Sequence, residues 1–151
     1  MDNIFDSSPA SRIIERIDQL QADSQPAWGK MNVSQMLLHC ASFQDIATGE
    51  QTASRSWLGL LVGKLAKPIL FNDKPIPHNM STIPNLIITD TPDFGQARET
   101  LKHKILSLQD MKRETGKMIL QPHPFFGKLS DEEWGKGMYK HLDHHLKQFG
   151  V

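Results

Sequence analysis

The chain has 151 residues, and its 17 lysines and arginines are balanced by 17 aspartates and glutamates, giving a formal net charge of +0. This length predicts a single domain over residues 1–151, and the balanced charge argues against a nucleic-acid partner. The one cysteine, Cys40, excludes a disulfide framework within the chain and favours a reducing compartment.

Two further classes of protein are disfavoured by the sequence. The N-terminus has no basic region followed by an apolar core, so we expect no secretion signal. The longest apolar stretch, residues 57–62, is far too short to span a bilayer, which takes about 20 residues. We therefore expect a cytoplasmic protein with no membrane partner.

The first predicted helix begins at Ser8 and Pro9, because serine is a common N-cap and proline is favoured in the first turn. Apolar residues then recur at helical spacing, namely Ile13, Ile14, Ile17 and Leu20. Pro26 and Gly29 follow and interrupt the pattern. An amphipathic first helix is therefore expected.

A second helix is predicted from Asn32, since asparagine followed three residues later by Gln35 is typical of a capping box. Its inward stripe is expected to contain Gln35, Met36, His39, Phe43 and Ile46. His39 thus occupies an inward position on an otherwise apolar face.

The segment from residue 49 to 91 carries no sustained periodicity and is predicted to be a long, partly irregular connection that covers a site or has structure of its own. Within it we predict a short helix at residues 56–67 and an extended segment at residues 85–90. Thr91 and Pro92 are typical of the start of a third long helix, which Gly116 closes. His103 on that helix is predicted to face water.

A short strand is predicted at residues 117–121, before a turn in which His123 lies between two prolines. His123 is interpreted either as a hydrogen-bonding loop residue or as a residue at the mouth of a pocket. Ser130 and Glu133 then form a second capping-box pattern, and Gly150 is placed for a left-handed cap at the far end of the last helix.

The inward stripe of this last helix contains Trp134, Met138, His141, His145 and Gln148. His141 and His145 are one turn apart, so their ring nitrogens can converge on one ion. A histidine pair of this kind is more often a hydrogen-bonded core pair, so a metal site needs a third ligand. If the second and fourth long helices are neighbours, His39 can supply it.

Four principal helices, with one long connection between the second and the third, predict an all-α fold and a four-helix bundle. The motif MNVSQMLLHC at residues 31–40 and the motif HLDHHLKQFG at residues 141–150 resemble the second-helix and fourth-helix motifs of the DinB/YfiT-like superfamily. The run HPFFG at residues 123–127 is similar to that of a poorly characterised branch, a domain of unknown function.

The resemblance implies a four-helix bundle of the DinB/YfiT type that binds a divalent transition metal through His39, His141 and His145. It also implies a homodimer and a small-molecule substrate, with a low-molecular-weight thiol as one candidate. The metal is expected to be Zn, Ni, Fe or Mn, and imidazole ligands, which suit zinc, nickel, copper and iron alike, do not select one. The implied activity is that of a thiol S-transferase of the bacillithiol type or of a small-molecule hydrolase.

No side chain stands out as catalytic, so the chemistry would depend on a metal-bound water or thiolate. Gln35, His144 and Gln148 are candidates for orienting ligands or substrate, although an ordinary hydrogen bond between helices is the simpler interpretation of both glutamines. Cys40 is expected to be a small core residue. The alternative function is a non-catalytic helical bundle with a structural metal or a role in binding a ligand or partner.

Overall fold

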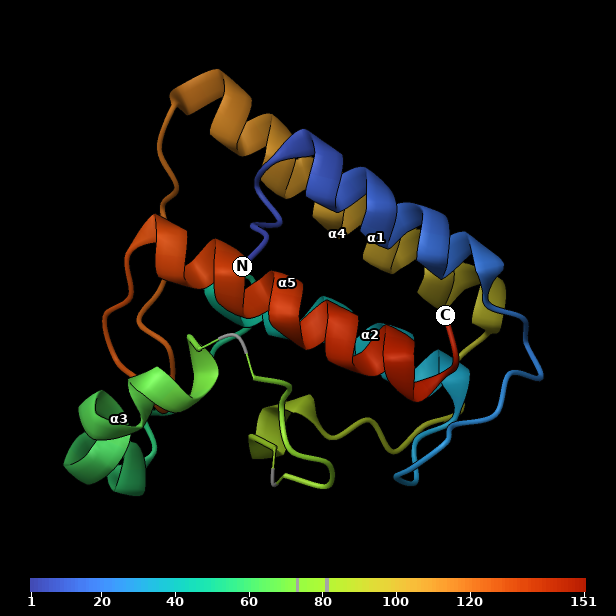
Figure 1. Cartoon of the computed structure of the whole chain (residues 1–151), viewed down its shortest axis with the longest axis horizontal. Helices are drawn as coiled ribbons and strands as arrows, with labels where there is room; N and C mark the ends of the chain where they lie inside the picture. The colour runs from blue at the N-terminus through green and yellow to red at the C-terminus, as the bar shows by residue number, and fades with distance from the viewer. Residues whose placement is uncertain (73, 81) are drawn as a thin grey trace.

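The computed structural model describes residues 1–72, 74–80 and 82–151, and the regular structure within these ranges is helical (Figure 1). The five α-helices are α1 (Ser7–Gln19), α2 (Val33–Thr48), α3 (Trp57–Leu70), α4 (Phe94–Thr115) and α5 (Asp131–Gln148), and a short 3-10 helix, η1, spans Pro84–Leu86. The predicted all-α class is therefore confirmed. Asp73 and Ser81 belong to the predicted connection at residues 49–91 and lie outside the described residues.

Both predicted capping boxes are present. The Asn32 side chain accepts a hydrogen bond from the backbone amide of Gln35 at 2.8 Å, and the backbone amide of Asn32 donates in turn to Oε1 of Gln35 at 3.0 Å. The Ser130 hydroxyl accepts in the same way from the Glu133 amide at 3.1 Å. These caps satisfy amides that a helix start leaves without intrahelical partners, and so fix where the two histidine-bearing helices begin.

Two predicted helix starts were wrong by one to three residues. The first helix begins at Ser7, with Asp6 as its N-cap residue. The third long helix begins at Phe94, because the side chain of Asp93 accepts a hydrogen bond from the Gln96 amide at 2.8 Å and caps the helix there. In α4 the capping side chain thus decides the first turn, whereas Asp6 makes no side-chain capping bond at the start of α1.

Two predicted extended segments were also wrong. Residues 117–121 form no strand, and the Gln121 amide donates to the carbonyl of Ala47 at the end of α2. The segment predicted at residues 85–90 begins instead within η1, where the Leu86 amide donates to Ile83. A strand needs a neighbouring strand to pair with, and in the described part of the chain the only β-bridge joins His123 and Gly127.

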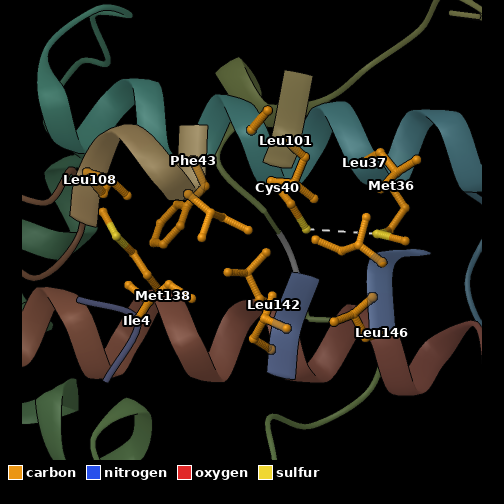
Figure 2. Close-up of a cluster of buried hydrophobic side chains, with 14 of the residues drawn as sticks. Ile4, Met36, Leu37, Cys40, Phe43, Leu101, Leu108, Met138, Leu142 and Leu146 are labelled. Carbon is orange, nitrogen blue, oxygen red and sulfur yellow. Dashed lines mark hydrogen bonds between the residues drawn. The ribbon is translucent and has the colours of Figure 1, made fainter. Parts of the chain in front are cut away.

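Helices α1, α2, α4 and α5, the four principal helices of the prediction, pack against one another. Both α1 and α2 contact α4 and α5, and Figure 1 shows α1 and α4 side by side along one edge, with α5 and α2 along the other. Figure 2 shows the core between them, where side chains of α2, α4 and α5 meet, including Met36, Cys40, Leu101, Leu142 and Leu146. The contact between α2 and α5 matters most, because it brings the two histidine-bearing helices together.

The remaining helix, α3, lies at one end of the molecule (green in Figure 1), where Lys67 pairs with Glu133 in the first turn of α5. It confirms the short helix predicted within the connection and extends it by three residues, to Leu70. No helix in the described ranges has the length and apolar character needed to cross a bilayer.

Candidate metal centre

Three of the predicted site residues meet between α2 and α5. His39 lies on α2, His141 and His145 lie one turn apart on α5, and one ring nitrogen from each lies within 4.8 Å of the others. The Nε2 atoms of His39 and His141 are 3.0 Å apart. Helix α2 thus supplies the third histidine that the pair on α5 lacks, and the three side chains together could hold one metal ion.

Two of the three rings are oriented by acceptors on their far side. Nδ1 of His39 lies 2.9 Å from the backbone carbonyl of Leu86 in η1, and Nδ1 of His145 lies 2.8 Å from Oε1 of Gln148. A carbonyl or amide oxygen can only accept, so in each neutral ring the proton sits on Nδ1. Each Nε2 is then left with a lone pair, which is the arrangement found in histidines that ligate metals.

The third ring leaves one nitrogen without a hydrogen bond. Nδ1 of His141 is buried, and no described residue provides it with a partner. Buried polar atoms without partners are uncommon and call for an explanation. An ion held by Nε2 of His141 would leave this Nδ1 atom protonated and still without an acceptor, so the fit to a metal rests on other features: the Nε2 atoms of His39 and His141 face each other, and three neutral imidazoles are a usual donor set for a divalent transition metal.

The protonation state of the three histidines also fits a metal site. Burial lowers the pKa of His39, lowers that of His145 to about 3, and holds that of His141 well below its usual range, with the neighbouring histidines adding to the effect. All three imidazoles are therefore neutral near pH 7. Neutral imidazole is the form that ligates a metal, because protonation removes the lone pair.

The two predicted glutamines have different positions. Gln148 lies beside the cluster, where its Oε1 accepts from His145 and its Nε2 donates to the carbonyl of Trp28 at 2.6 Å. This approach depends on Gly29, whose φ is +83° and where an added Cβ would lie 2.6 Å from the same Nε2. Gln35 instead holds the start of α2, and its amide donates to Asp90, so the suggestion that it orients a ligand or substrate is not supported.

His144 lies on the flank of the cluster, as predicted, with its ring 5.0 Å from that of His145. It also lines a cavity of about 290 Å³, together with Trp28, His78, Lys74 and Tyr139. The rings of Trp28 and His78 stack with their centroids 3.8 Å apart. A small molecule in this cavity would lie one histidine ring away from the candidate metal centre.

Cys40 is buried in the core, as predicted, and burial raises the pKa of its thiol. The same burial keeps the thiol protonated at neutral pH, and a protonated thiol is a poor metal ligand. Cys40 is therefore core packing, with its sulfur 3.9 Å from that of Met36 (Figure 2).

His123 is a loop residue that accepts hydrogen bonds, which was the first of its two predicted roles. Its ring is buried, and Nδ1 accepts from the amides of Phe125 at 3.0 Å and Phe126 at 3.2 Å. The ring also packs near those of Phe43 and Trp134. His123 therefore holds the turn at residues 123–127 in shape and does not join the other three histidines.

The burial of His123 predicts a pH dependence of stability. Burial lowers its pKa from 6.5 to about 4, so between these two values the unfolded chain binds more protons than the folded chain. The free energy of unfolding should therefore fall as the pH drops through this window, by about 3 kcal/mol from this group alone. Above pH 6.5 the contribution is complete and constant.

The measurement is urea denaturation of the native chain and of His123→Asn across this pH window. The asparagine oxygen can accept from the same two amides but cannot be protonated, so the variant should lose less stability on acidification than the native chain does. His123→Phe removes the acceptor, so its free energy of unfolding should be lower than that of His123→Asn at every pH. If the free energy of unfolding depended on pH equally in the native chain and in His123→Asn, the pH effect could not be assigned to His123.

Several residues around the centre had no signal in the sequence. Leu86 contributes its backbone carbonyl, which every residue carries, and it reaches His39 from a position 47 residues away. Trp28 and His78 come from irregular segments on either side of α2 and α3. No periodicity links such positions, so only the folded chain places them together.

The fold and the cluster define an all-helical protein with three neutral histidines converging from two neighbouring helices. The chain belongs to a family of proteins of unknown function, DUF1569, whose model matches residues 5–150. No curated protein matches the chain. No solved structure matches it either.

Proposed function

We propose that this protein is a metal-dependent enzyme that binds a divalent transition metal through His39, His141 and His145. The observation that carries the proposal is the orientation of the cluster, in which Leu86 and Gln148 hold Nδ1 of two rings and direct their Nε2 lone pairs toward the third. Three protein ligands leave at least one coordination position open, which is typical of catalytic sites.

The chemistry follows from the neutral ligand set. A divalent ion bound by three neutral imidazoles keeps its full charge, and it would activate a water or lower the pKa of a thiol. Gln148 and Leu86 keep the rings in the tautomer that such binding needs. Among the described residues no side chain outside the cluster stands out as a general base, so a hydrolytic reaction would rely on the water that the metal would bind.

The substrate is proposed to be a small molecule that approaches through the cavity beside His144. The residues that line this cavity of about 290 Å³ include Trp28, Tyr139, Lys74 and Lys140, and Nζ of Lys140 donates to the carbonyl of Asn72 at 2.8 Å. Thiol S-transfer, with a low-molecular-weight thiol, and hydrolysis are the two reactions proposed. The proposal includes the DinB/YfiT-type arrangement of the four long helices and a homodimer.

The test is metal content by elemental mass spectrometry on protein purified without an affinity tag. The native chain should carry about one equivalent of a transition metal such as Zn, Ni, Fe or Mn. His39→Ala and His141→Ala should each lose it, whereas His103→Ala, an exposed histidine on α4, should keep it. Absence of metal from the native chain after reconstitution with all four ions would refute the proposal.

A non-catalytic role is the second candidate, and one contact favours it. The Nε2 atoms of His39 and His141 are close enough, at 3.0 Å, for one ring to donate to the other, so part of the cluster can be satisfied without an ion. In this case the centre is a polar core or a structural metal site. Removal of metal by a chelator should then lower the melting temperature strongly, and no exchangeable water should reach the ion.

A further inference from the structure

The surface of α3 is unusually apolar for a helix in contact with solvent. Its exposed fractions reach 81% for Leu65, 73% for Trp57, 70% for Leu61 and 66% for Leu60, and Leu58 and Val62 are also exposed. Single exposed apolar side chains are ordinary, but six on one helix of 14 residues form a continuous patch. A patch of this kind usually marks a surface that is covered in the working protein.

The packing of α3 fixes this orientation. Gly59 and Gly63, one turn apart, face the turn at residues 123–127, and a Cβ on either glycine would collide with the carbonyl oxygen of Phe125. The amide of Ser56 donates to Pro124 at 3.0 Å, and Nζ of Lys67 donates to Glu133 at 3.1 Å. The helix thus contacts the rest of the protein through its backbone and turns its large side chains outward.

The charged side chains of this segment are basic. Residues 51–72 contain Arg55, Lys64 and Lys67 and no aspartate or glutamate, although the whole chain has a net charge of +0. Lys67 is paired with Glu133 and Nη1 of Arg55 donates to the carbonyl of His123, whereas Lys64 is exposed on the same outward side as the leucines. An apolar surface that carries an exposed lysine and no carboxylate of its own helix suits an anionic partner.

We propose that the outward face of α3 binds an anionic lipid surface and attaches the protein peripherally to a membrane. The helix is too short to cross a bilayer, but a helix lying flat needs only to sink its apolar side chains to the boundary of the acyl region. Leucines and a tryptophan supply that contact, and Lys64 pairs with the headgroups. A second copy fits less well, because two such faces would bring two copies of Lys64 together, and α3 carries no carboxylate to pair with them.

This inference does not depend on the metal centre, and it revises the prediction that the protein has no membrane partner. Helix α3 is too short to span a bilayer, but a helix of this length can lie in the interface between the membrane and water. The apolar run at residues 57–62 was predicted to be a helix, and only the folded chain shows that its glycines face inward and its leucines outward.

The experiment is flotation of the full chain with vesicles of phosphatidylcholine alone or mixed with phosphatidylglycerol. We expect binding to the anionic vesicles, a blue shift of Trp57 fluorescence that Trp57→Phe abolishes, and weaker binding as salt is raised. Leu65→Asp should lower the partition coefficient about tenfold or more. Lys64→Glu should weaken binding to the anionic vesicles only.

The matched control is Ile119→Asp, because Ile119 is 80% exposed, close to the value for Leu65, and lies outside α3. This variant should bind the vesicles like the native chain. Failure of the native chain to float with anionic vesicles would overturn the proposal, as would equal losses in Leu65→Asp and Ile119→Asp. A dimer seen by sedimentation without vesicle binding, and lost in Leu65→Asp, would assign the face to a second copy instead.

Discussion

Trp134→Ala is expected to lower the free energy of unfolding by about 3–5 kcal/mol, the usual cost of truncating a large buried aromatic residue. Trp134 is 1% exposed and lies near the rings of Phe43 and His123. Its Nε1 also donates to the carbonyl of Gln121 at 3.0 Å. The variant therefore opens a cavity and removes the donor of a partly buried hydrogen bond.

Urea denaturation with Trp134→Phe alongside separates these two effects. Phenylalanine refills much of the space but cannot donate to Gln121, so it should cost about 1–3 kcal/mol. A loss of less than about 1 kcal/mol in the alanine variant would mean that the site collapses around the cavity or that α5 packs differently. The comparison thus tests the packing of α5 against the turn at residues 123–127.

Gln148→Met is expected to weaken metal binding about 10-fold to 100-fold, the usual effect of removing the group that orients a ligating histidine. This prediction rests on the proposed metal centre. Methionine has nearly the same length as glutamine but cannot accept from Nδ1 of His145, so that ring loses the contact that fixes its tautomer. Affinity can be measured by competition with a chromophoric chelator.

Gln35→Met is the matched control for this measurement. It makes the same substitution at a glutamine whose hydrogen bonds hold the start of α2 and do not reach the cluster. It should reduce stability through the lost capping contact while leaving metal affinity unchanged. If the native chain and Gln148→Met bound the metal with equal affinity, Gln148 would have no role in orienting a ligand, even if metal is bound.

The histidine cluster could be predicted in part from the sequence because helical periodicity is a local property. The spacing of His141 and His145 places both rings on one face, and the position of His39 among apolar residues places it inward. Their meeting depends on α2 and α5 being neighbours, which periodicity does not specify. The resemblance between motifs supplied that pairing as an expectation, and the contact between the two helices bears it out.

The surroundings of the cluster could be predicted only in part, because Gln148 and His144 lie on a predicted helix whereas Leu86 comes from the long connection. Gln35 and Gln148 each lie within a turn or so of a cluster histidine in the sequence, yet one caps a helix and the other holds His145. The difference arises because a side chain near a helix start has free amides within reach, whereas one near a helix end does not. Leu86 acts through a backbone carbonyl, which composition cannot reveal.

The hydrogen bond between His39 and the carbonyl of Leu86 links the long connection to the candidate metal centre. An ion that stabilises this orientation of the His39 ring must also stabilise the observed arrangement of η1. Because the coupling is reciprocal, an arrangement of η1 that stabilises the ring raises the affinity for the ion by the same factor. The irregular segment therefore acts as a thermodynamic partner of the centre, although it supplies no side-chain ligand. Substitutions in η1 that loosen its fold should change how tightly an ion is held, at a distance in sequence from all three histidines.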